Sequence, residues 1–561
     1  MAKEKKKTEQ VLTPAQKIDE LLSNYVDGRD VFKKADDWDY KLQLVPGAED
    51  KDIPRNWIEL ADKVISILAH DKYGLDTYKN RIEIISAETM LDLYASVGLP
   101  ESYPHWSFGM QREQEGKSYN QGRSGLAYEI VINTDPAIAY CMDSNTKTMQ
   151  MLVIAHASYG HNSFFKGNHM FKQFTKPRNI LADQAAMCEA VLRYEDKYGQ
   201  EEVEKVLDAA HALQNYGVNR YNKPQRRTPQ EEAARRAQLE EIRQQNVNPL
   251  MDSPIFRDAF NNAANDNGEK QHFPADLEEN LLRYVAAYAP HLQEWQRDLL
   301  RRVSDLSQYF YPQRQTQVMN EGWASFWHYT IMNDLHEMDL IDDGMSMEFV
   351  QSHCGVLFQP EFDSPYYSGW NPYALGFAIY QDIKRMCENP TDEDREYFPD
   401  IAGKEWLPTL KWAMQNFKDE SFIEQFLSPK VIRDMGMFNI HDDELEEFLV
   451  VDAVQNPDGY KVIAERLAAQ YRLAEREPAI EVAGYNYRGD RSLTLQHKMF
   501  KYRPLHEENT KGVLKHLYSL WGHPVVIHSV SPEGTVSATI SMPTSAAERG
   551  LKLGDKMKYN I

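Results

Sequence analysis

Three histidines lie close together in the segment 155–169, which reads Ala-His-Ala-Ser-Tyr-Gly-His-Asn-Ser-Phe-Phe-Lys-Gly-Asn-His. Imidazole nitrogens are common ligands of zinc and other transition metals, so His156, His161 and His169 are candidate metal ligands. On a straight α-helix, residues four apart diverge by about 40°, whereas residues five apart diverge by about 140°. His156 and His161 can therefore converge on one ion only if Gly160 breaks the helix or a π-bulge lies between them.

A second group of polar residues occurs in the apolar, aromatic stretch 317–328. Glu321, Ser325 and His328 have the spacing i, i+4, i+7, which places them within about 60° of one another on a helix. A buried carboxylate needs a partner, because an unpaired buried charge is costly. For Glu321 that partner is a metal ion, Arg314 or one of the histidines in the first group, and the sequence leaves these alternatives open.

Together the two groups resemble the site of helical zinc peptidases. In several of those families a glutamate from an E-G-W-A or E-G-x-A segment completes a His pair on an earlier helix, and residues 321–324 read Glu-Gly-Trp-Ala. The resemblance implies that His156, His161 and Glu321 hold zinc or another divalent metal. There are two departures from the pattern. Ala157 stands where zincins carry their glutamate base, and the two histidines are five residues apart instead of four.

A hydrolase built on these residues needs another general base. Glu129, in the β-branched segment 125–133, is a candidate catalytic residue, and Glu321 itself is another. His328 is a candidate for a catalytic role, and His169 for a place among or beside the metal ligands. The alternative interpretation is a polar network without catalytic function, whose satisfied hydrogen bonds fix the packing of a large helical core.

Other motifs carry weaker signals. His105 lies in an aromatic turn, and His353 adjoins Cys354 without a second pair at ligand spacing. Neither a G-x-G-x-x-G nor a P-loop pattern occurs, so no nucleotide site is predicted. Ser158 and Ser325 lack the sequence context of a nucleophile elbow.

The elements that must position these residues are predicted to be mainly helical. Thr13 followed by Pro14 indicates a helix start, and Asn371 followed by Pro372 indicates another. An almost wholly apolar segment leads directly into the first histidines, so we expect it at the centre of the fold. Helical patterns cover the regions from Thr13, 58–68, 82–97, 149–155, 182–198 and 201–214 and the start at Asn371.

The fold class we predict is mainly α, a large multi-helix core domain with a small C-terminal α+β module. Gln, Arg, Glu and Asn dominate residues 222–271, which is typical of an exposed insertion. Near the C-terminus, strands are predicted at 493–500, 524–530 and 535–540, around a helix at 509–521. The predicted divisions are a disordered N-terminus (1–12), the first part of the helical core (13–221), the exposed charged insertion (222–271), the second part of the core (272–476) and the α+β module (486–561).

Composition narrows the classes of function. The formal net charge of −22 disfavours binding to nucleic acid and to anionic membrane surfaces. Four cysteines in 561 residues, none in a C-x-x-C pair, fit a reducing compartment. The basic N-terminus leads into no apolar segment, and no apolar run is long enough to span a membrane. These features predict a cytoplasmic protein without membrane or nucleic-acid partners, and they do not specify its oligomeric state.

Several longer strings resemble the stage V sporulation protein R (SpoVR) family, in the expected order over roughly residues 13–540. The strings lie at 125–133, 155–165, 318–328, 371–377, 398–403, 417–422 and 488–493, and include Val-Met-Asn-Glu-Gly-Trp-Ala-Ser-Phe-Trp-His and Asn-Pro-Tyr-Ala-Leu-Gly-Phe. This chain is similar to the proteobacterial, non-sporulating branch.

The resemblance implies a bacterial protein of a stress or stationary-phase module. The founding member is linked to spore cortex formation, and members are commonly encoded beside a PrkA-type serine kinase and a von Willebrand A-like protein. Two hypotheses result. One is a metal-dependent hydrolase with a zincin-like His/His/Glu site. The other is a non-catalytic regulator or scaffold that acts with the kinase and the von Willebrand A-like protein.

Overall fold

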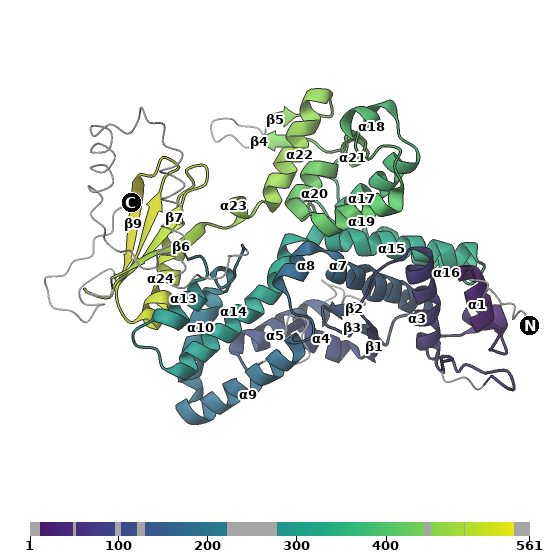
Figure 1. Ribbon diagram of the computed structural model, residues 1–561, viewed down its shortest axis with the longest axis horizontal. Coiled ribbons are helices and arrows are strands. Elements are labelled where there is room, and N and C mark those ends of the chain that lie inside the picture. The colour runs from purple at the N-terminus through teal and green to yellow at the C-terminus, as the bar shows by residue number, and fades with distance from the viewer. Residues whose placement is uncertain are drawn as a thin grey trace, which may run out of the picture. The chain divides into compact units, whose positions relative to one another are not determined.

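The computed structural model describes residues 12–48, 52–95, 103–120, 129–221, 278–441, 450–486 and 489–543. The chain divides into two compact units, Met1–Gly199 with Tyr309–Arg476 (unit 1) and Gln200–Gln308 with Glu477–Ile561 (unit 2). Residues 1–11 of the predicted disordered N-terminus, the predicted insertion 222–271 and residues 125–128 of the β-branched segment 125–133 lie outside the described residues. The predicted mainly α fold with a small C-terminal sheet is confirmed (Figure 1).

Helices make up most of the described part of unit 1. Their bounds are α1 (Pro14–Leu22), α2 (Val31–Lys34), α3 (Trp57–Ile67), α4 (Ala87–Ala95), α5 (Trp106–Asn120), α6 (Lys147–Val153), α7 (Asn162–Gly167), α8 (His169–Phe174), α9 (Ile180–Tyr198), α15 (Gln317–Glu337), α16 (Asp343–Val356), α17 (Pro372–Glu388), α18 (Asp392–Tyr397), α19 (Trp406–Asn416), α20 (Asp419–Phe426), α21 (Pro429–Asp434), α22 (Pro457–Tyr471) and α23 (Leu473–Arg476). A 3₁₀-helix, η1 (Gly28–Asp30), and two π-helices, η2 (Leu68–Lys72) and η3 (Ile154–His161), interrupt them. The long helix α14 (Glu294–Gln315) contributes to unit 1 from Tyr309 onward.

The predicted helix starts are confirmed at the level of hydrogen bonds. The Thr13 side chain accepts from the backbone N–H of Gln16, and the Gln16 side chain accepts from the N–H of Thr13, which is a capping box. Asn371 accepts from the N–H of Tyr373 at the start of α17. These caps satisfy N–H groups that have no partner inside the helix.

A sheet of three strands lies beside the helices of unit 1, in the order β1-β3-β2. The strands are β1 (Asn80–Ile85), β2 (Glu129–Ile132) and β3 (Ala137–Met142); β1 is parallel to β3, and β2 is antiparallel to it. The predicted helix over 82–97 is therefore wrong in its first part, where the β-branched Ile82–Ile85 run pairs with β3 and the helix α4 begins only at Ala87. A second, small sheet pairs β4 (Asn439–His441) with β5 (Val450–Ala453).

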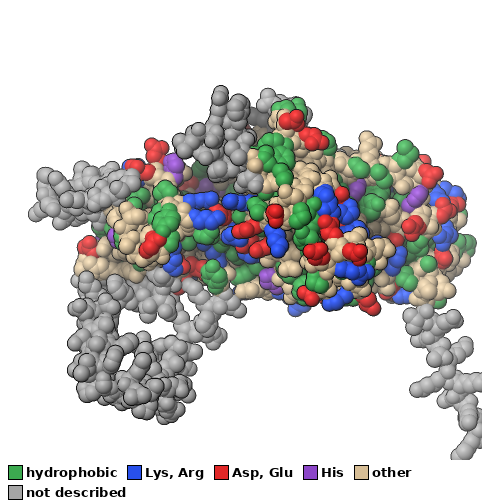
Figure 2. Space-filling model, turned by 90° about the horizontal axis from the view of Figure 1, so that it is seen from above, with side chains coloured by type: hydrophobic (Ala, Val, Ile, Leu, Met, Phe, Trp, Pro, Cys, Tyr) green, Lys and Arg blue, Asp and Glu red, His purple; other side chains and the backbone are tan. Residues whose placement is uncertain are grey.

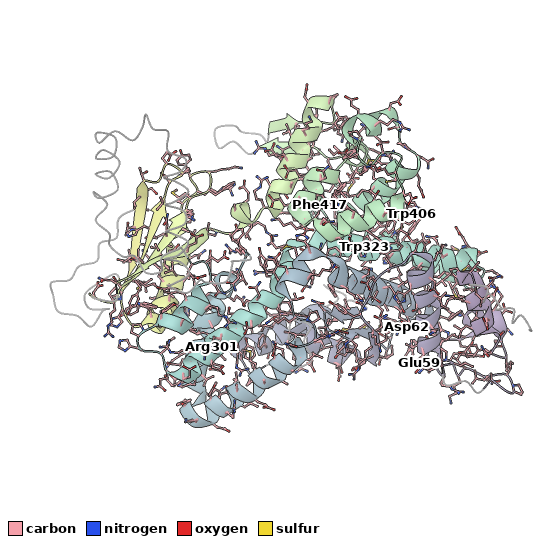
Figure 3. All side chains as sticks on the ribbon, viewed as in Figure 1. Glu59, Asp62, Arg301, Trp323, Trp406 and Phe417 are labelled. Atoms are coloured by element: carbon pink, nitrogen blue, oxygen red, sulfur yellow. The ribbon has the colours of Figure 1, made fainter. Side chains whose placement is uncertain are left out.

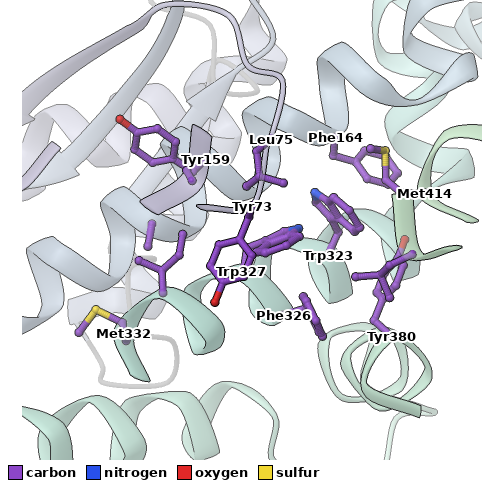
Figure 4. Packing of buried hydrophobic residues seen from close by; sticks show 14 of the residues in the cluster. Tyr73, Leu75, Tyr159, Phe164, Trp323, Phe326, Trp327, Met332, Tyr380 and Met414 are labelled. Carbon is purple, nitrogen blue, oxygen red and sulfur yellow. The ribbon is translucent and has the colours of Figure 1, made fainter. Parts of the chain in front are cut away.

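The core of unit 1 is built around α15, whose middle turns are fully buried. Trp323, Phe326 and Trp327 pack against Tyr73 and Tyr380, with ring centroids 5.0–6.5 Å apart (Figure 4). Edge-to-face and tilted pairs of this kind stabilise a core beyond the effect of buried area alone. The helix that carries Glu321 is therefore anchored by aromatic side chains in the core.

Polar contacts fix α15 and η3 to their neighbours. The indole Nε1 of Trp323, a residue labelled in Figure 3, donates to Ser163 Oγ at 2.9 Å, which ties α15 to α7. The Tyr159 hydroxyl of η3 donates to Asp62 Oδ1 of α3 at 2.7 Å. At the start of α15, the Asp419 carboxylate accepts from the backbone N–H groups of Val318 and Met319. A carboxylate there also interacts favourably with the helix dipole.

Unit 2 contains α10 (Gln200–Ala212), η4 (Gln214–Tyr216), α13 (Leu281–Tyr288), α14 up to Gln308 and the C-terminal sheet. The sheet has the order β6-β7-β8-β9, with β6 (Ala479–Tyr485), β7 (Leu493–Lys498), β8 (Val525–Val530) and β9 (Val536–Met542), and α24 (Glu507–Trp521) packs against it. The predicted strands at 493–500, 524–530 and 535–540 and the helix at 509–521 are confirmed, while β6 was not predicted.

The surface carries charges of both signs. On the face drawn in Figure 2, Lys and Arg side chains are interspersed with Asp and Glu side chains, and no large field of one sign appears among the coloured residues. Within the described part of the chain, no helix is long and apolar enough to cross a membrane.

Candidate functional site

The π-helix η3 brings His156 and His161 together. A π-helix bonds residue i to residue i+5, so side chains five apart share one face, unlike those on an α-helix. The two imidazole rings lie with their centroids 4.6 Å apart and nearly perpendicular to each other. Of the two routes predicted from the spacing, the chain uses the π-helical one, and Gly160 lies within η3 instead of breaking it.

The glycines of both groups let the helices approach closely. A Cβ on Gly160 would lie 2.6 Å from the Cα of Ala324, so a side chain there would push α15 away from η3. A Cβ on Gly322 would lie 2.3 Å from the backbone carbon of Gly376 on α17. Three positions of the Glu-Gly-Trp-Ala segment therefore have a structural reason: Gly322 lets α17 approach, Trp323 fills the core, and Ala324 lets η3 approach.

Two carboxylates meet the two histidines in one buried cluster, which we call the His–Glu cluster (Glu129, His156, His161 and Glu321). Glu129 Oε1 lies 3.5 Å from His156 Nε2, and Glu321 Oε2 lies 3.4 Å from His161 Nε2 and 3.8 Å from His156 Nε2. Glu129, His156 and His161 offer ligand atoms that all lie within 4.8 Å of one another. The residues come from β2, η3 and α15, so three separate segments of unit 1 build the cluster.

The cluster opens into a pocket of about 420 Å³. Glu129 Oε2 and Glu321 Oε2 are buried and have no hydrogen-bond partner. No lysine or arginine occurs among the described residues that line this pocket. Two buried carboxylates without a lysine or arginine are costly to ionise, and the usual solutions are a metal ion or a proton held on a carboxylate or a neighbouring histidine. The described residues that line the pocket are Gln111, Glu129, Ile130, Val131, Ile132, Asn133, His156, His161, Phe165, Phe171, Tyr309, Phe310, Gln313, Asn320, Glu321 and Tyr373.

Hydrogen bonds on the far side of each ring orient both histidines. Asn320 Oδ1 lies 3.0 Å from His161 Nδ1, so His161 donates from Nδ1 and its Nε2 faces the carboxylates. His156 Nδ1 lies 2.8 Å from His328 Nδ1, so its Nε2 also faces the cluster. A histidine that binds a metal through one nitrogen almost always donates its other N–H to a partner in this way.

The bond behind His156 continues as a chain of three imidazoles. His328 Nε2 lies 2.7 Å from His353 Nδ1 on α16. If His156 keeps its Nε2 lone pair, it donates from Nδ1 to His328, and His328 in turn donates from Nε2 to His353. Both nitrogens of His328 are then used, and His328 is not among the described residues that line the pocket. The geometry thus places His328 where it orients His156.

The pKa values in the cluster are pushed apart. Burial raises the pKa of Glu129 to about 8. Of its charged neighbours, His161 lowers this pKa and Glu321 raises it. Burial also disfavours ionised Glu321, but His161 and His156 hold its pKa well below the usual range. Burial lowers the pKa of His156 to about 4, whereas the Glu321 carboxylate raises the pKa of His161 against the effect of burial. Without a metal, Glu321 is therefore ionised, and Glu129 and His161 are the groups whose proton affinity is raised.

The donor set fits a divalent transition metal. Zn–N and Zn–O bonds of about 2.0–2.2 Å in a tetrahedron place neighbouring ligand atoms roughly 3.3–3.5 Å apart. The observed N–O separations of 3.4, 3.5 and 3.8 Å are close to that edge length. Two imidazoles with carboxylates are ligands that zinc and similar ions accept.

The comparisons with known proteins agree with the order of the motifs. Residues 52–476 match the family described as SpoVR like protein, and residues 478–532 match the SpoVR-like C-terminal domain. The chain belongs to the SpoVR family. It is similar to the "Uncharacterized protein YcgB" of Escherichia coli (strain K12), with 49% identity over 464 residues, which cover 83% of this chain and 90% of the relative. No solved structure matches the chain. The resemblance predicted from the sequence, including its proteobacterial branch, is confirmed.

The SpoVR-like strings contain every member of the His–Glu cluster, but one predicted ligand lies elsewhere. His169 is at the start of α8, and its Nδ1 lies 3.2 Å from the backbone oxygen of Gln415. It is not among the described residues that line the pocket, because α8 begins a new helix after the turn at Asn168. His105, the weaker candidate, lies 2.6 Å from Ser107 Oγ through its Nδ1 and also does not line the pocket.

Sequence reasoning missed two contributors to the site, Asn320 and His353. Asn320 directly precedes Glu321. Neighbouring residues on an α-helix point about 100° apart, so the position of Asn320 beside a candidate ligand was a signal for it. His353 lies 25 residues beyond His328 on the next helix, and no local spacing could have joined them.

Proposed function

We propose that this SpoVR-family protein is a metal-dependent hydrolase whose site is the His–Glu cluster. The observation that carries the proposal is the pair of buried oxygens without hydrogen-bond partners, Glu129 Oε2 and Glu321 Oε2, facing two histidines whose Nε2 atoms point into the cluster. A purely structural network would satisfy these oxygens, because unpaired buried polar groups destabilise a fold.

The roles of the residues depend on the surroundings of each group. His156, His161 and Glu321 would hold the ion, since Glu321 remains ionised and each histidine has a hydrogen-bond partner at Nδ1 that leaves its Nε2 toward the cluster. A divalent ion bound there would supply a Lewis acid that polarises a carbonyl and lowers the pKa of water. Asn320 and His328 keep the two rings in position by accepting their Nδ1–H groups.

Glu129 is the proposed general base. It shares the pocket with the two histidines, and its Oε1 lies 3.5 Å from His156 Nε2. A carboxylate beside the site of the ion can take a proton from water and give it to a leaving group. Glu129 thus replaces the glutamate that zincins carry at the position of Ala157.

The deciding experiment is elemental analysis of protein purified without chelators and without a metal-binding tag. The wild type should contain near-stoichiometric zinc, iron or manganese, and a His161→Ala, Glu321→Ala double variant should contain none. The matched control is His169→Ala, which removes a histidine outside the cluster and should retain the metal.

Two results would contradict the proposal. One is a wild type without metal after dialysis against micromolar zinc, and the other is a double variant that keeps its metal while its circular dichroism matches the wild type. Loss of metal in the His169→Ala variant would move the site away from the His–Glu cluster.

A second candidate function is that of a regulator or scaffold acting with a PrkA-type serine kinase and a von Willebrand A-like protein. It is supported by large apolar side chains exposed on α16 and the following loop, namely Met347 (73% exposed), Phe358 (68%) and Tyr366 (82%). This function predicts co-purification with either protein, and substitution of the three side chains by serine should abolish that co-purification. Retention of binding by that variant would exclude this surface.

A further inference from the structure

The strand that carries Glu129 borders the pocket along its edge. Five consecutive residues, Glu129–Asn133, line the pocket. Successive side chains of a strand point to opposite faces of the sheet, so a pocket on one face would touch only alternate residues. Contact with every residue in turn means that the pocket runs beside the backbone itself.

That edge of β2 is open in the sheet of the described residues. The sheet order β1-β3-β2 leaves β2 paired only with β3. In an antiparallel pair, alternate residues direct their N–H and C=O groups toward the partner, and the others direct theirs away from it. The carbonyls of Ile132 and Asn133 already accept from the Thr134 N–H and the Tyr309 hydroxyl, so the edge available for pairing is Glu129–Val131.

The charge of the pocket selects the kind of substrate. Two carboxylates face it, and no lysine or arginine lines it among the described residues. A phosphate or carboxylate substrate would be bound through cationic side chains, usually arginine. A neutral chain of amides needs none, because it is recognised through main-chain hydrogen bonds and apolar walls such as Phe165, Phe171 and Phe310.

We propose that the substrate is an extended polypeptide segment that adds as a strand to the free edge of β2, with its scissile carbonyl at the His–Glu cluster. This inference rests on the hydrolase function proposed above. The three available residues of β2 span about 10 Å at roughly 3.3 Å per residue, which is enough to pair about three substrate residues on one side of the scissile bond.

The reaction is hydrolysis of a peptide bond. The oxygen of water adds to the carbonyl carbon, and Glu129 takes one proton of that water. The C–N bond breaks, and Glu129 gives the proton to the leaving nitrogen. The products are a carboxylic acid and an amine, so no oxidant, reductant or second substrate is needed.

The test uses the zinc-loaded full chain and a tryptic digest of a bacterial lysate, with new termini read by mass spectrometry. The best-cleaved peptide is then synthesised with single amides replaced by esters, which removes one N–H at a time. Strand addition predicts that kcat/KM falls at least 10-fold at alternate positions and changes little at the positions between them. A loss without this period of two, or no loss at any position, overturns the inference.

Two variants of β2 check the same edge from the side of the protein. In Ile130→Pro and Val131→Pro, one proline removes an N–H that bonds to β3, and the other removes an N–H that faces the pocket. The variant that removes the N–H facing the pocket should keep its unfolding midpoint and its zinc, and its kcat/KM for peptide cleavage should fall at least 10-fold. If every variant that stays folded cleaves peptides like the wild type, the edge has no role in binding.

The outcomes also separate this inference from the proposed function. Zinc-dependent hydrolysis of p-nitrophenyl acetate, lost in the His161→Ala, Glu321→Ala variant but without cleavage of any peptide, would overturn the peptide substrate and retain the hydrolase. Absence of zinc, iron and manganese together with the absence of all hydrolysis would overturn both.

Discussion

Unit 1 contains two buried clusters of charged residues that solve the same electrostatic problem in opposite ways. In the Arg385 cluster (Asp382, Arg385, Thr391, Asp394 and Ser428), every carboxylate oxygen accepts a hydrogen bond. Arg385 donates to Asp382 Oδ1 at 2.6 Å and to both oxygens of Asp394 at 2.6 and 2.7 Å. Ser428 donates to the other oxygen of Asp382, and Thr391 donates twice to Asp394.

The His–Glu cluster has as many carboxylates, but it lacks an arginine and leaves two oxygens without a partner. This contrast distinguishes a structural network from a functional site. A satisfied network stabilises the packing of α17, α18 and α21, whereas an unsatisfied one persists only where a ligand or a proton completes it. Stability should thus depend on the first cluster, and metal binding on the second.

The largest decrease in the free energy of unfolding should come from Arg385→Ala. Removal of the guanidinium leaves Asp382 and Asp394 buried without a counter-charge, which destabilises the fold by about 3–5 kcal/mol. Urea unfolding of the metal-free protein measures the change. The matched control is Arg433→Ala, which breaks a more exposed pair with Glu393 and should cost about 1 kcal/mol or less. Equal losses in both variants would remove the distinction between the clusters.

A smaller change in the free energy of unfolding is expected from Glu129→Gln in the metal-free protein, and this change should depend on pH. Burial raises the pKa of Glu129 from 4.5 to about 8, so the folded state holds the proton more tightly than the unfolded state. The resulting stability is fully present below about pH 4.5 and is lost as the pH rises through about 8. From about pH 5 to about pH 8 the variant should gain on the order of 3 kcal/mol relative to the wild type.

Unfolding curves at several pH values measure this slope, and Asp394→Asn is the control. Burial opposes ionised Asp394, but Arg385 lowers its pKa to about 2, so its stabilisation is lost only as the pH falls from about 3.8 toward 2. The free energy of unfolding of Asp394→Asn, plotted against pH, should therefore run parallel to that of the wild type between about pH 5 and about pH 8. A parallel Glu129→Gln profile would show that burial does not retain the proton on Glu129.

The smallest effect should be a loss of metal affinity in His328→Phe. This change removes the partner of His156 Nδ1 and leaves the residues that line the pocket unchanged. Loss of a residue that orients a metal ligand typically weakens metal binding 10–100-fold, about 1.4–2.7 kcal/mol. Competition with a zinc chelator measures the affinity. Ser325→Ala is the matched control, since Ser325 lies on the same stripe of α15 and its hydroxyl is buried without a partner. A loss as large in Ser325→Ala would indicate general loosening of the helix.

The helical parts of the fold could be predicted because their signals are local. Thr13 and Pro14 start α1 as predicted, and the apolar stripes of α3, α9 and α10 match their helices within a few residues. The parallel pair of β1 and β3 was not predicted. A short β-branched run such as Arg81–Ile85 fits a helix or a strand equally well, and only the distant β3 decides between them.

The candidate site shows the same division between local and long-range information. The stripe of Glu321 and His328 is predicted by helical spacing and is confirmed in its geometry, since both residues face the same histidine. The convergence of His156 and His161 was predicted only on the condition that Gly160 breaks the helix or that a π-bulge lies between them. The sequence did not decide between these conditions, because π-helical bonding has no clear signature in sequence. His353 enters through tertiary structure alone.

The π-helix η3 also sets the rotational register of the residues after His161. Its wider turn holds one more residue than a turn of an α-helix, so the side chains after it keep the orientation that they would have on an α-helix one residue shorter. Deletion of Ser158 would therefore give four-residue spacing between the histidines and leave Phe164 and Phe165 of α7 facing the core in which they are buried. A spacing of five on a π-helix and a spacing of four on an α-helix are thus two ways to present the same pair of rings.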